Sequence, residues 1–560
     1  CKNTQVPFRL GMVPSTLKVQ RDKPFPPEGI WEDKGVAASP PVRSEVDSSW
    51  RKGAIELCRN EEEAVQLVIG QNDRELKNVK ITVSDLKGTG DAVIPASSIK
   101  IRPLGYVKTE PSGIYLTERD GWFADVLLEI DTFNLPPETP QPIWISFRAG
   151  SDTKPGTYTG SITVGADGIS EKSIPFFTIH VYDFELPVAH SLPVLMWGGT
   201  HLKAHGYEKG SPEAKALAAQ HEDLLFAHRM VPGWHTRKFD WNRATLPRNE
   251  DGTFDFTEYD ATVERLMKKG MTRFMIGHAP RLGKWGFPDH FSEQWKKNLA
   301  EFITAMTAHL KEKGWLENAI YYSIDEAARK EWPSCKMIYK LIKDIEPDLT
   351  ILQTLNEPKA TQELSKFADI INVNVRQYYK ARVPELQKEG LETWWYVCCW
   401  PNENPNLFIE YPGIDPRIIG WMTWKYKTTG MVYWQTMAWG KAFDNMGGKK
   451  YIDTIKSKWN TVSFGRYNGD GNLFYPGPDG KILCTMRLEG YRDGLEDYEY
   501  LMLLKRAVEA GKLEGPALER AKQILKIDDT ICDLNFNYEL TGETMRKVRR
   551  EIARILEGVE

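Results

Sequence analysis

Two adjacent carboxylates follow a short apolar stretch near the middle of this 560-residue chain. The stretch Ala319–Ile324 is rich in apolar and aromatic side chains, which indicates a buried strand. Asp325 and Glu326 come next, and a helical pattern then runs from Ala327 to Ile345. In a barrel of alternating strands and helices, catalytic groups lie at the carboxyl ends of the strands. A pair of acids at such an end is suited to breaking a glycosidic bond.

The adjacency of Asp325 and Glu326 restricts where they can act together. Neighbouring side chains of a strand point to opposite faces, so both acids reach the same side only where the strand ends and the chain turns. In the alternative interpretation, one acid caps the following helix and the other is solvated. The pair alone favours catalysis only modestly.

The elements around the pair predict a (β/α)8 barrel. Between Leu192 and about Leu504 there are eight strand candidates, each followed by a helical pattern, and this alternation is typical of that fold. The strand candidates are Pro193–Trp197, Met230–Trp234, Thr272–Gly277, Ala319–Ile324, Thr350–Thr354, Ile370–Val375, Thr393–Cys398 and Gly430–Thr436. The helical patterns include Pro212–His228, Phe256–Lys269, Ser292–Lys313, Ala327–Ile345, Ala360–Phe367 and Val383–Glu389.

The rest of the chain flanks this barrel. Many short alternating or β-branched runs with turn signals between them predict a β-sandwich before it. A helical tail follows it, in which Met545, Val548, Ile552 and Ile555 have a spacing close to helical. We therefore expect a β-sandwich domain at 1–188, a catalytic barrel at 189–510 and a C-terminal helical extension packed on the barrel at 511–560.

Charge and composition exclude some classes of partner. The 73 basic and 77 acidic residues give a net charge of −4, so no nucleic-acid partner and no basic membrane-binding face are expected. The seven cysteines show no metal-ligand spacing, and His235 and His278 have no matched ligands, so we expect neither a metal nor a cofactor.

Aromatic side chains are dense in the barrel region. Of the 19 tryptophans, 14 fall between Trp197 and Trp439. A large core explains some of them, but flat apolar rings are also surfaces on which sugars stack. From their positions we expect sugar contacts from Asn374, Tyr378, Trp394, Trp424, Trp434, Tyr475 and His278. For Trp394, core packing is the alternative, because Trp395 and Tyr396 must alternate with it across the strand.

A charged stretch from Arg487 to Leu504 indicates the last barrel helix. Its paired charges belong either to the base of the barrel mouth or to a buried ion-pair lattice that holds the long loop Gly440–Met486. We favour the lattice for most of Arg487, Glu489, Arg492 and Asp493.

Several motifs together resemble glycoside hydrolase family 123. They are Asn60-Glu61 through Gln66–Val68, the turn Gly156–Gly160, Asp325-Glu326, the segment Asp470–Gly477 and the segment Arg492–Tyr500. The resemblance implies an N-acetyl-β-galactosaminidase that combines a β-sandwich with a (β/α)8 barrel and acts on a carbohydrate with retention and substrate assistance. By position in the motif, Asp325 would hold the acetamido group of the substrate, and Glu326 would be the general acid and then the general base.

Other functions remain open on the sequence. The same scaffold suits another β-glycosidase, such as an N-acetylglucosaminidase or an endo-acting enzyme, because one inverted hydroxyl separates the two sugars. A non-catalytic glycan-binding lipoprotein is a third possibility, and the intact acids argue against it.

The first residue of the chain suggests a location. Cys1 and the polar segment Lys2–Gln5 are typical of a bacterial lipoprotein whose signal peptide has been removed, which predicts a lipid-anchored protein of the cell envelope. The alternative is a chain boundary without biological meaning.

Overall fold

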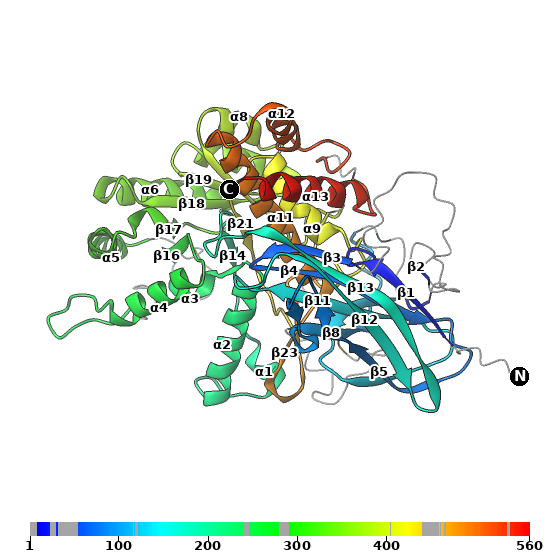
Figure 1. The fold of residues 1–560 in the computed structure, drawn as a ribbon. Helices are drawn as coiled ribbons and strands as arrows, with labels where there is room; N and C mark the ends of the chain where they lie inside the picture. The colour runs from blue at the N-terminus through cyan, green and yellow to red at the C-terminus, as the bar shows by residue number, and fades with distance from the viewer. Residues whose placement is uncertain are drawn as a thin grey trace, which may run out of the picture.

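The N-terminal part of the computed structural model is a sandwich of two β-sheets (Figure 1). The structure describes residues 8–22, 30–31, 54–115, 117, 121–239, 246–278, 291–403, 405–439, 459, 461–463, 466–534 and 538–559, and Cys1 lies outside these ranges. The first sheet has the order β2-β1-β4-β11-β8-β9 and the second is built on β10-β5-β12-β13-β3. Apolar side chains from both sheets form one core, which confirms the predicted sandwich.

The strand bounds of the sandwich are as follows. The first sheet contains β1 (Arg9–Pro14), β2 (Ile30–Trp31), β4 (Glu61–Gly70), β8 (Ile99–Lys108), β9 (Trp122–Leu127) and β11 (Gln141–Ala149). The second contains β3 (Ala54–Arg59), β5 (Leu76–Val83), β10 (Thr132–Leu135), β12 (Gly156–Ala166) and β13 (Ile169–Glu185), with β6 (Leu86–Lys87) and β7 (Val93–Ile94) beside β12.

Eight parallel strands form the second part of the chain, as predicted. Their order is β15-β14-β21-β20-β19-β18-β17-β16, which is the cyclic order of a (β/α)8 barrel. Within the described residues no ladder joins β15 to β16, so the curled sheet is open there. The strands are β14 (Val194–Met196), β15 (Val231–Pro232), β16 (Phe274–His278), β17 (Ala319–Tyr322), β18 (Thr350–Leu355), β19 (Ile370–Asn374), β20 (Glu392–Tyr396) and β21 (Met431–Tyr433).

Helices alternate with these strands. They include α2 (Pro212–Ala227), α4 (Thr257–Lys268), α5 (Glu293–Lys313), α6 (Trp332–Ile345), α7 (Pro358–Leu364), α8 (Val383–Lys388), α9 (Asp415–Lys425) and α11 (Met486–Glu509). Helix α6 begins at Trp332 rather than at Ala327, because a turn that carries the two acids comes first. A helix was predicted between the last two strands, but its bounds were not given; the structure places α9 there, buried on nearly every face and so without an apolar–polar period.

The C-terminal tail is helical and contacts both parts of the molecule. Helix α12 (Gly515–Ile524) packs on α11, while α13 (Glu543–Glu557) contacts α11 and also β13 of the sandwich (Figure 1). The predicted packing on the barrel is therefore only part of its role. Among the described helices, none is long and apolar enough to cross a membrane.

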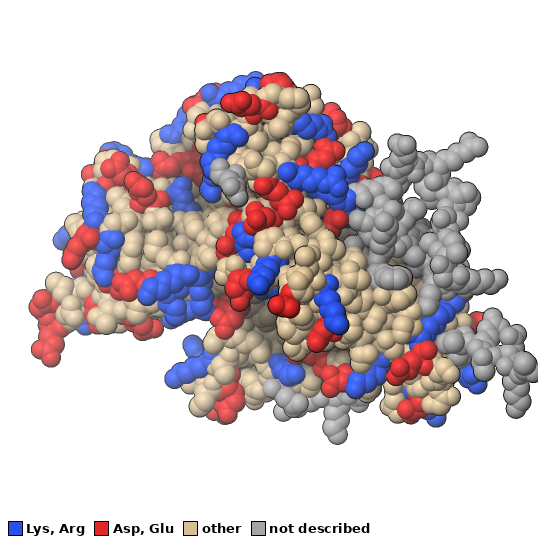
Figure 2. Space-filling model, viewed as in Figure 1, with Lys and Arg blue, Asp and Glu red and all other residues tan. Residues whose placement is uncertain are grey.

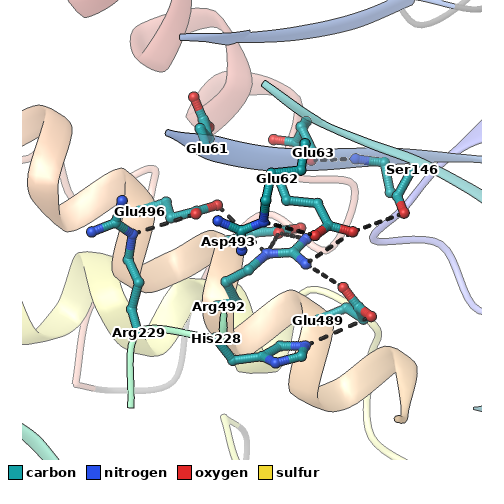
Figure 3. Close-up of polar contacts among 12 residues, drawn as sticks. Glu61, Glu62, Glu63, Ser146, His228, Arg229, Glu489, Arg492, Asp493 and Glu496 are labelled. Carbon is teal, nitrogen blue, oxygen red and sulfur yellow. Dashed lines mark hydrogen bonds and ion pairs between the residues drawn. The ribbon is translucent and has the colours of Figure 1, made fainter. Parts of the chain in front are cut away.

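Buried ion pairs join the sandwich to the barrel (Figure 3). Three successive acids of β4, Glu61, Glu62 and Glu63, meet arginines of the barrel helices and of α13. Glu62 accepts from Ser146 (2.9 Å) and lies 3.8 Å from Arg492 of α11. Arg492 in turn pairs with Asp493 (2.6 Å). We call this set the joint network.

Other pairs extend the joint network around α11. Arg417 of α9 reaches Glu63 (2.9 Å) and Asp497 (2.7 Å), and Arg549 of α13 reaches Asp497 (2.7 Å). Arg487 makes a two-pronged contact with Asp125 of β9 (2.7 and 2.8 Å). The same guanidinium donates to the carbonyls of Gly469 and Asn472 and so holds the loop before α11. The predicted ion-pair lattice is thereby confirmed.

Two glycines allow α9 and α11 to approach closely. A Cβ placed on Gly420 would lie 2.1 Å from the carbonyl oxygen of Gly494. Only residues without a side chain fit at this crossing. It brings Arg417 and Asp497 within ion-pair distance of one another.

The surface carries both signs of charge. In Figure 2, acidic and basic side chains are interspersed across the coloured part of this face. This distribution agrees with the near-balance of 73 basic and 77 acidic residues.

Candidate active site

Asp325 and Glu326 lie in a turn that follows β17. The strand ends at Tyr322, three residues before Asp325. Glu326 has a φ of 44°, in the left-handed region that residues other than glycine rarely adopt. Such a conformation costs about 1–3 kcal/mol and persists only where the surrounding structure holds it. The chain therefore turns where both neighbouring acids can reach the barrel mouth.

Strand β18 holds this turn in place. The amides of Ser323 and Glu326 donate to the carbonyls of Leu352 and Thr354, each at 3.1 Å. The buried side chain of Gln353 donates to the Ile324 carbonyl at 2.8 Å. Three contacts to a neighbouring strand thus offset the strained conformation of Glu326.

Neither acid caps the following helix. The amide of Ala328 donates to the carboxylate of Glu331 at 2.8 Å, so Glu331 serves the start of that helix. The capping interpretation of Asp325 and Glu326 is therefore wrong. Their carboxylates make other contacts.

Glu326 is held by two side chains from other strands. Tyr396, the last residue of β20, donates to Oε1 at 2.6 Å, and Asn356, just after β18, donates to Oε2 at 3.0 Å. Burial, followed by the nearby charge of Glu326, raises the pKa of Tyr396 well above its usual range. The phenol therefore keeps its proton. It can donate to the ionised form of Glu326 or accept from the protonated form.

Asp325 is held by a buried chain of hydroxyl groups. The Tyr322 hydroxyl lies 2.7 Å from Asp325 Oδ1 and 2.6 Å from Thr354 Oγ1. Because an ionised carboxylate can only accept, the single Tyr322 proton goes to Asp325 and Thr354 donates to Tyr322. Asn372 donates to Thr354 Oγ1 at 3.0 Å. We call Asn372, Thr354 and Tyr322 the Asp325 support chain.

The two acids therefore have different surroundings. Asp325 is exposed, and among the described residues Tyr322 is its one hydrogen-bond donor, so its second oxygen can accept from a ligand. Glu326 is partly buried and has a partner on each oxygen. This arrangement suits one acid that orients a substrate and another that transfers a proton.

Of the predicted sugar contacts, Trp434 lies at the mouth with part of its ring exposed. It directly follows β21, and its indole N–H donates to Asp470 at 2.9 Å. A Cβ on Gly471 would lie 2.4 Å from this ring, so the loop backbone packs directly against it. Trp434 is therefore a well-fixed platform at the mouth.

Asn374 ends β19 but uses its amide within the protein. Its Oδ1 accepts from the Arg376 amide (3.1 Å) and its Nδ2 donates to the Trp400 carbonyl (3.0 Å). The side chain is buried, so it shapes the rim of the mouth and does not present a group to a sugar.

Trp394 and Tyr378 belong to the core, which corrects their predicted role. Trp394 has no exposed surface, and its indole donates to Glu392 near the start of β20. Its ring is therefore below the mouth. Tyr378 is 3% exposed and donates to the carbonyl of Tyr426, beyond the outer helix α9.

Trp424 and Tyr475 also lie away from the two acids. Trp424 is on α9, where its indole donates to the Leu525 carbonyl and its ring packs on Tyr498. Tyr475 is fully buried and donates to Asp125 of the sandwich at 2.8 Å. It secures the contact between the two parts and does not close over the site.

His278 remains a prediction. It ends β16, at the correct edge of the sheet, but its side chain lies outside the described residues.

The sequence did not single out four side chains of the site. Tyr322, Thr354, Asn372 and Asn356 surround the acids. A weak signal exists for Asn356, a polar residue directly after the fifth barrel strand. Trp197, directly after β14, packs edge-on against Tyr322 with ring centroids 4.5 Å apart.

One cluster outside the site has metal-ligand types. Ligand atoms of His228, Cys484 and Glu489 lie within 4.8 Å of one another. Arg102 is 3.0 Å from Glu489, and Arg492 is also paired with it. Two guanidinium groups at the carboxylate disfavour a cation, and burial raises the pKa of the Cys484 thiol to about 12. The cluster suits the joint network and not a metal.

Comparisons with known proteins agree with this geometry. The family model for the glycoside hydrolase 123 catalytic domain matches residues 188–504, and that for the glycoside hydrolase 123 N-terminal domain matches residues 39–166. No curated protein sequence matches the chain significantly.

Among solved structures, a family 123 glycoside hydrolase from Clostridium perfringens has a similar fold. It is 15% identical, with a TM-score of 0.64, and the match covers 98% of this chain and 99% of that one. That structure is described as showing the details of glycolipid glycan hydrolysis. A family 2 β-galacturonidase from Eisenbergiella tayi bound to galacturonate is 10% identical over 78% of this chain and 69% of its own, with a TM-score of only 0.30.

The match to the catalytic-domain model extends from the start of the barrel into α11 and includes both acids. The chain belongs to glycoside hydrolase family 123.

Proposed function

We propose that this glycoside hydrolase is a retaining, exo-acting N-acetyl-β-galactosaminidase that uses the acetamido group of its own substrate. The observation that carries the proposal is the turn that brings Asp325 and Glu326 to the mouth as neighbours. In ordinary retaining enzymes, two carboxyl groups about 5 Å apart act from opposite sides of the bond. Two successive residues of one turn are poorly placed for that geometry.

A 2-acetamido sugar removes the need for a protein nucleophile. Its carbonyl oxygen attacks the anomeric carbon, the glycosidic C–O bond breaks, and an oxazolinium ring forms. Glu326 gives its proton to the leaving oxygen, then takes a proton from the water that opens the ring. Asp325 accepts the hydrogen bond of the acetamido N–H, orienting the carbonyl and stabilising the positive charge of the ring.

The contacts of the two acids support these roles. Tyr396 can hold Glu326 in both protonation states, as a residue that alternates between acid and base requires. Tyr322 fixes one oxygen of Asp325, and the other remains available to the substrate. Trp434 is the candidate platform for the sugar ring. The product would be the terminal N-acetylgalactosamine residue, released from a glycan or from a glycolipid.

A hydrolysis assay with matched aryl β-N-acetylgalactosaminide and β-N-acetylglucosaminide tests the proposal. We expect turnover of the first and much slower turnover of the second. Glu326→Gln should lose roughly a hundredfold or more on poor leaving groups, and less on activated aryl groups that need no acid. Asp325→Asn should lose activity even with activated groups.

Two outcomes would contradict the proposal. If Asp325→Asn had the activity of the wild type, the substrate-assisted step would be refuted. Failure of a thiazoline mimic of the ring intermediate to inhibit competitively would do the same, because transition-state-like ligands bind much more tightly than substrates.

A further inference from the structure

A stacked cation and tryptophan lie on the rim of the mouth. The Arg376 guanidinium is 4.0 Å from the centroid of the Trp400 ring. Trp400 is 38% exposed, unusually open for so large an apolar side chain. Among the described residues, no carboxylate lies within ion-pair distance of Arg376. The pair thus combines a partly exposed ring with a guanidinium that has no ion-pair partner in the described part of the chain.

Buried amides fix the position of this pair. Asn374 accepts from the Arg376 amide at 3.1 Å and donates to the Trp400 carbonyl at 3.0 Å, so one side chain sets the two backbones against each other. Asn406 donates to the carbonyls of Cys398 (2.8 Å) and Pro401 (2.7 Å) on both sides of Trp400. The pair is preorganised, which lowers the entropy that a ligand would lose on binding.

The pair lies at the same end of the barrel as Glu326. Trp400 follows β20, whose last residue, Tyr396, donates to Glu326. A general acid must contact the oxygen of the leaving group, so the aglycone lies next to Glu326. Arg376 and Trp400 follow the neighbouring strands β19 and β20 at this same end of the barrel.

The chemistry of the pair selects a ligand class. A tryptophan ring accepts the apolar face of a sugar. A guanidinium stacked on that ring keeps its N–H edge open and binds a carboxylate or a sulfate through two parallel hydrogen bonds. Resting on the proposed function, we propose that Arg376 and Trp400 form an aglycone subsite for a sugar that carries an anionic group.

Three disaccharides test this subsite. Each has β-linked N-acetylgalactosamine on methyl glucoside, on methyl glucuronide or on methyl glucoside 6-sulfate, with the same linkage throughout. We expect kcat/KM for the anionic substrates to exceed that for the neutral one by about tenfold, the size of one hydrogen bond between charged groups. A preference for only one anion supports the subsite and identifies a carboxylate or a sulfate as its ligand.

Variants assign the preference to the pair. Arg376→Gln should bring the ratio of anionic to neutral substrate to about one. Arg382→Gln is the matched control: it is an exposed arginine of the same connection whose nearest acid, Glu385, is 3.9 Å away. It should keep the wild-type ratio. A wild-type ratio of one, or an unchanged ratio in Arg376→Gln, would overturn the inference.

Binding separates this inference from the proposed function. Calorimetric titration of Glu326→Gln with the three disaccharides requires no turnover. If the wild-type enzyme hydrolysed neither the neutral disaccharide nor the aryl glycoside, the proposed function would be refuted. Tighter binding of the anionic disaccharides to Glu326→Gln, lost in the double variant that also carries Arg376→Gln, would still support the subsite. Equal binding of all three would overturn it.

Discussion

Removal of the buried Tyr322 hydroxyl should impair catalysis although Asp325 and Glu326 are both kept. In Tyr322→Phe, Asp325 loses its hydrogen-bond donor and Thr354 loses its acceptor. A hydrogen bond to a charged group contributes about 1.5–3 kcal/mol, which corresponds to roughly 10- to 150-fold in rate. Asp325 is exposed, so water can replace part of the lost contact. We therefore expect the lower end, about tenfold in kcat.

The assay is the initial rate on an activated aryl β-N-acetylgalactosaminide, for which Glu326 is not needed as an acid. The loss should appear in kcat more than in KM, because the contact orients Asp325 for the charged intermediate. Tyr321→Phe is the control, since Tyr321 is equally buried in β17 and its side chain points to the opposite face. If Tyr322→Phe keeps the wild-type kcat, or if both variants lose it equally, the support chain does not position Asp325.

Three further predictions concern the rest of the site and the scaffold. Tyr396→Phe should reduce kcat/KM for poor leaving groups more than for activated ones, because Tyr396 contacts the proposed acid. Rates on a series of aryl glycosides that differ in leaving-group pKa measure this. Arg549→Met should reduce the free energy of unfolding by about 3–5 kcal/mol, because among the described residues the buried Glu61 loses its one ion-pair partner and Asp497 keeps only Arg417. The exposed Arg554→Met on the same helix should have little effect, and urea titrations measure both variants. Burial raises the pKa of Asp470 from 3.8 to about 6, so its contribution to stability is present below pH 3.8 and is lost as the pH rises through 6. The stability of wild type relative to Asp470→Asn should thus fall by about 2 kcal/mol between pH 4 and pH 7, measured by urea unfolding at each pH; a constant difference would contradict the shift.

The fold was predictable because its signals are local and repeated. Alternating strands in the first part and eight strand–helix units in the second are visible without tertiary information. The bounds of helix α9 could not be predicted, because its burial on nearly all faces removes the period that marks a surface helix. The start of α6 was misplaced because the functional turn interrupts the helical pattern before Trp332.

The acids were predictable from their place at a strand end, but most sugar contacts were not. A strand's alternation indicates which face a side chain occupies and not how deep it lies in the barrel. Trp394 and Tyr396 share a face of β20, yet Tyr396 reaches Glu326 while Trp394 lies below and bonds to Glu392. The support chain of Asp325 was invisible for a related reason, since it combines residues from three strands whose register only the structure provides.

In the segment Arg492–Tyr500, one of the motifs that carry the family resemblance, Arg492, Asp493 and Asp497 belong to the joint network. These side chains join the sandwich to the barrel, so this motif reports the contact between the two parts and not a contact with the sugar. It also follows that an exchange of the sandwich alone between relatives would strand Glu61, Glu62 and Glu63 opposite arginines of a foreign barrel. We therefore expect an exchange of one part to give a stable protein only when the acids of β4 and their arginine partners are exchanged together.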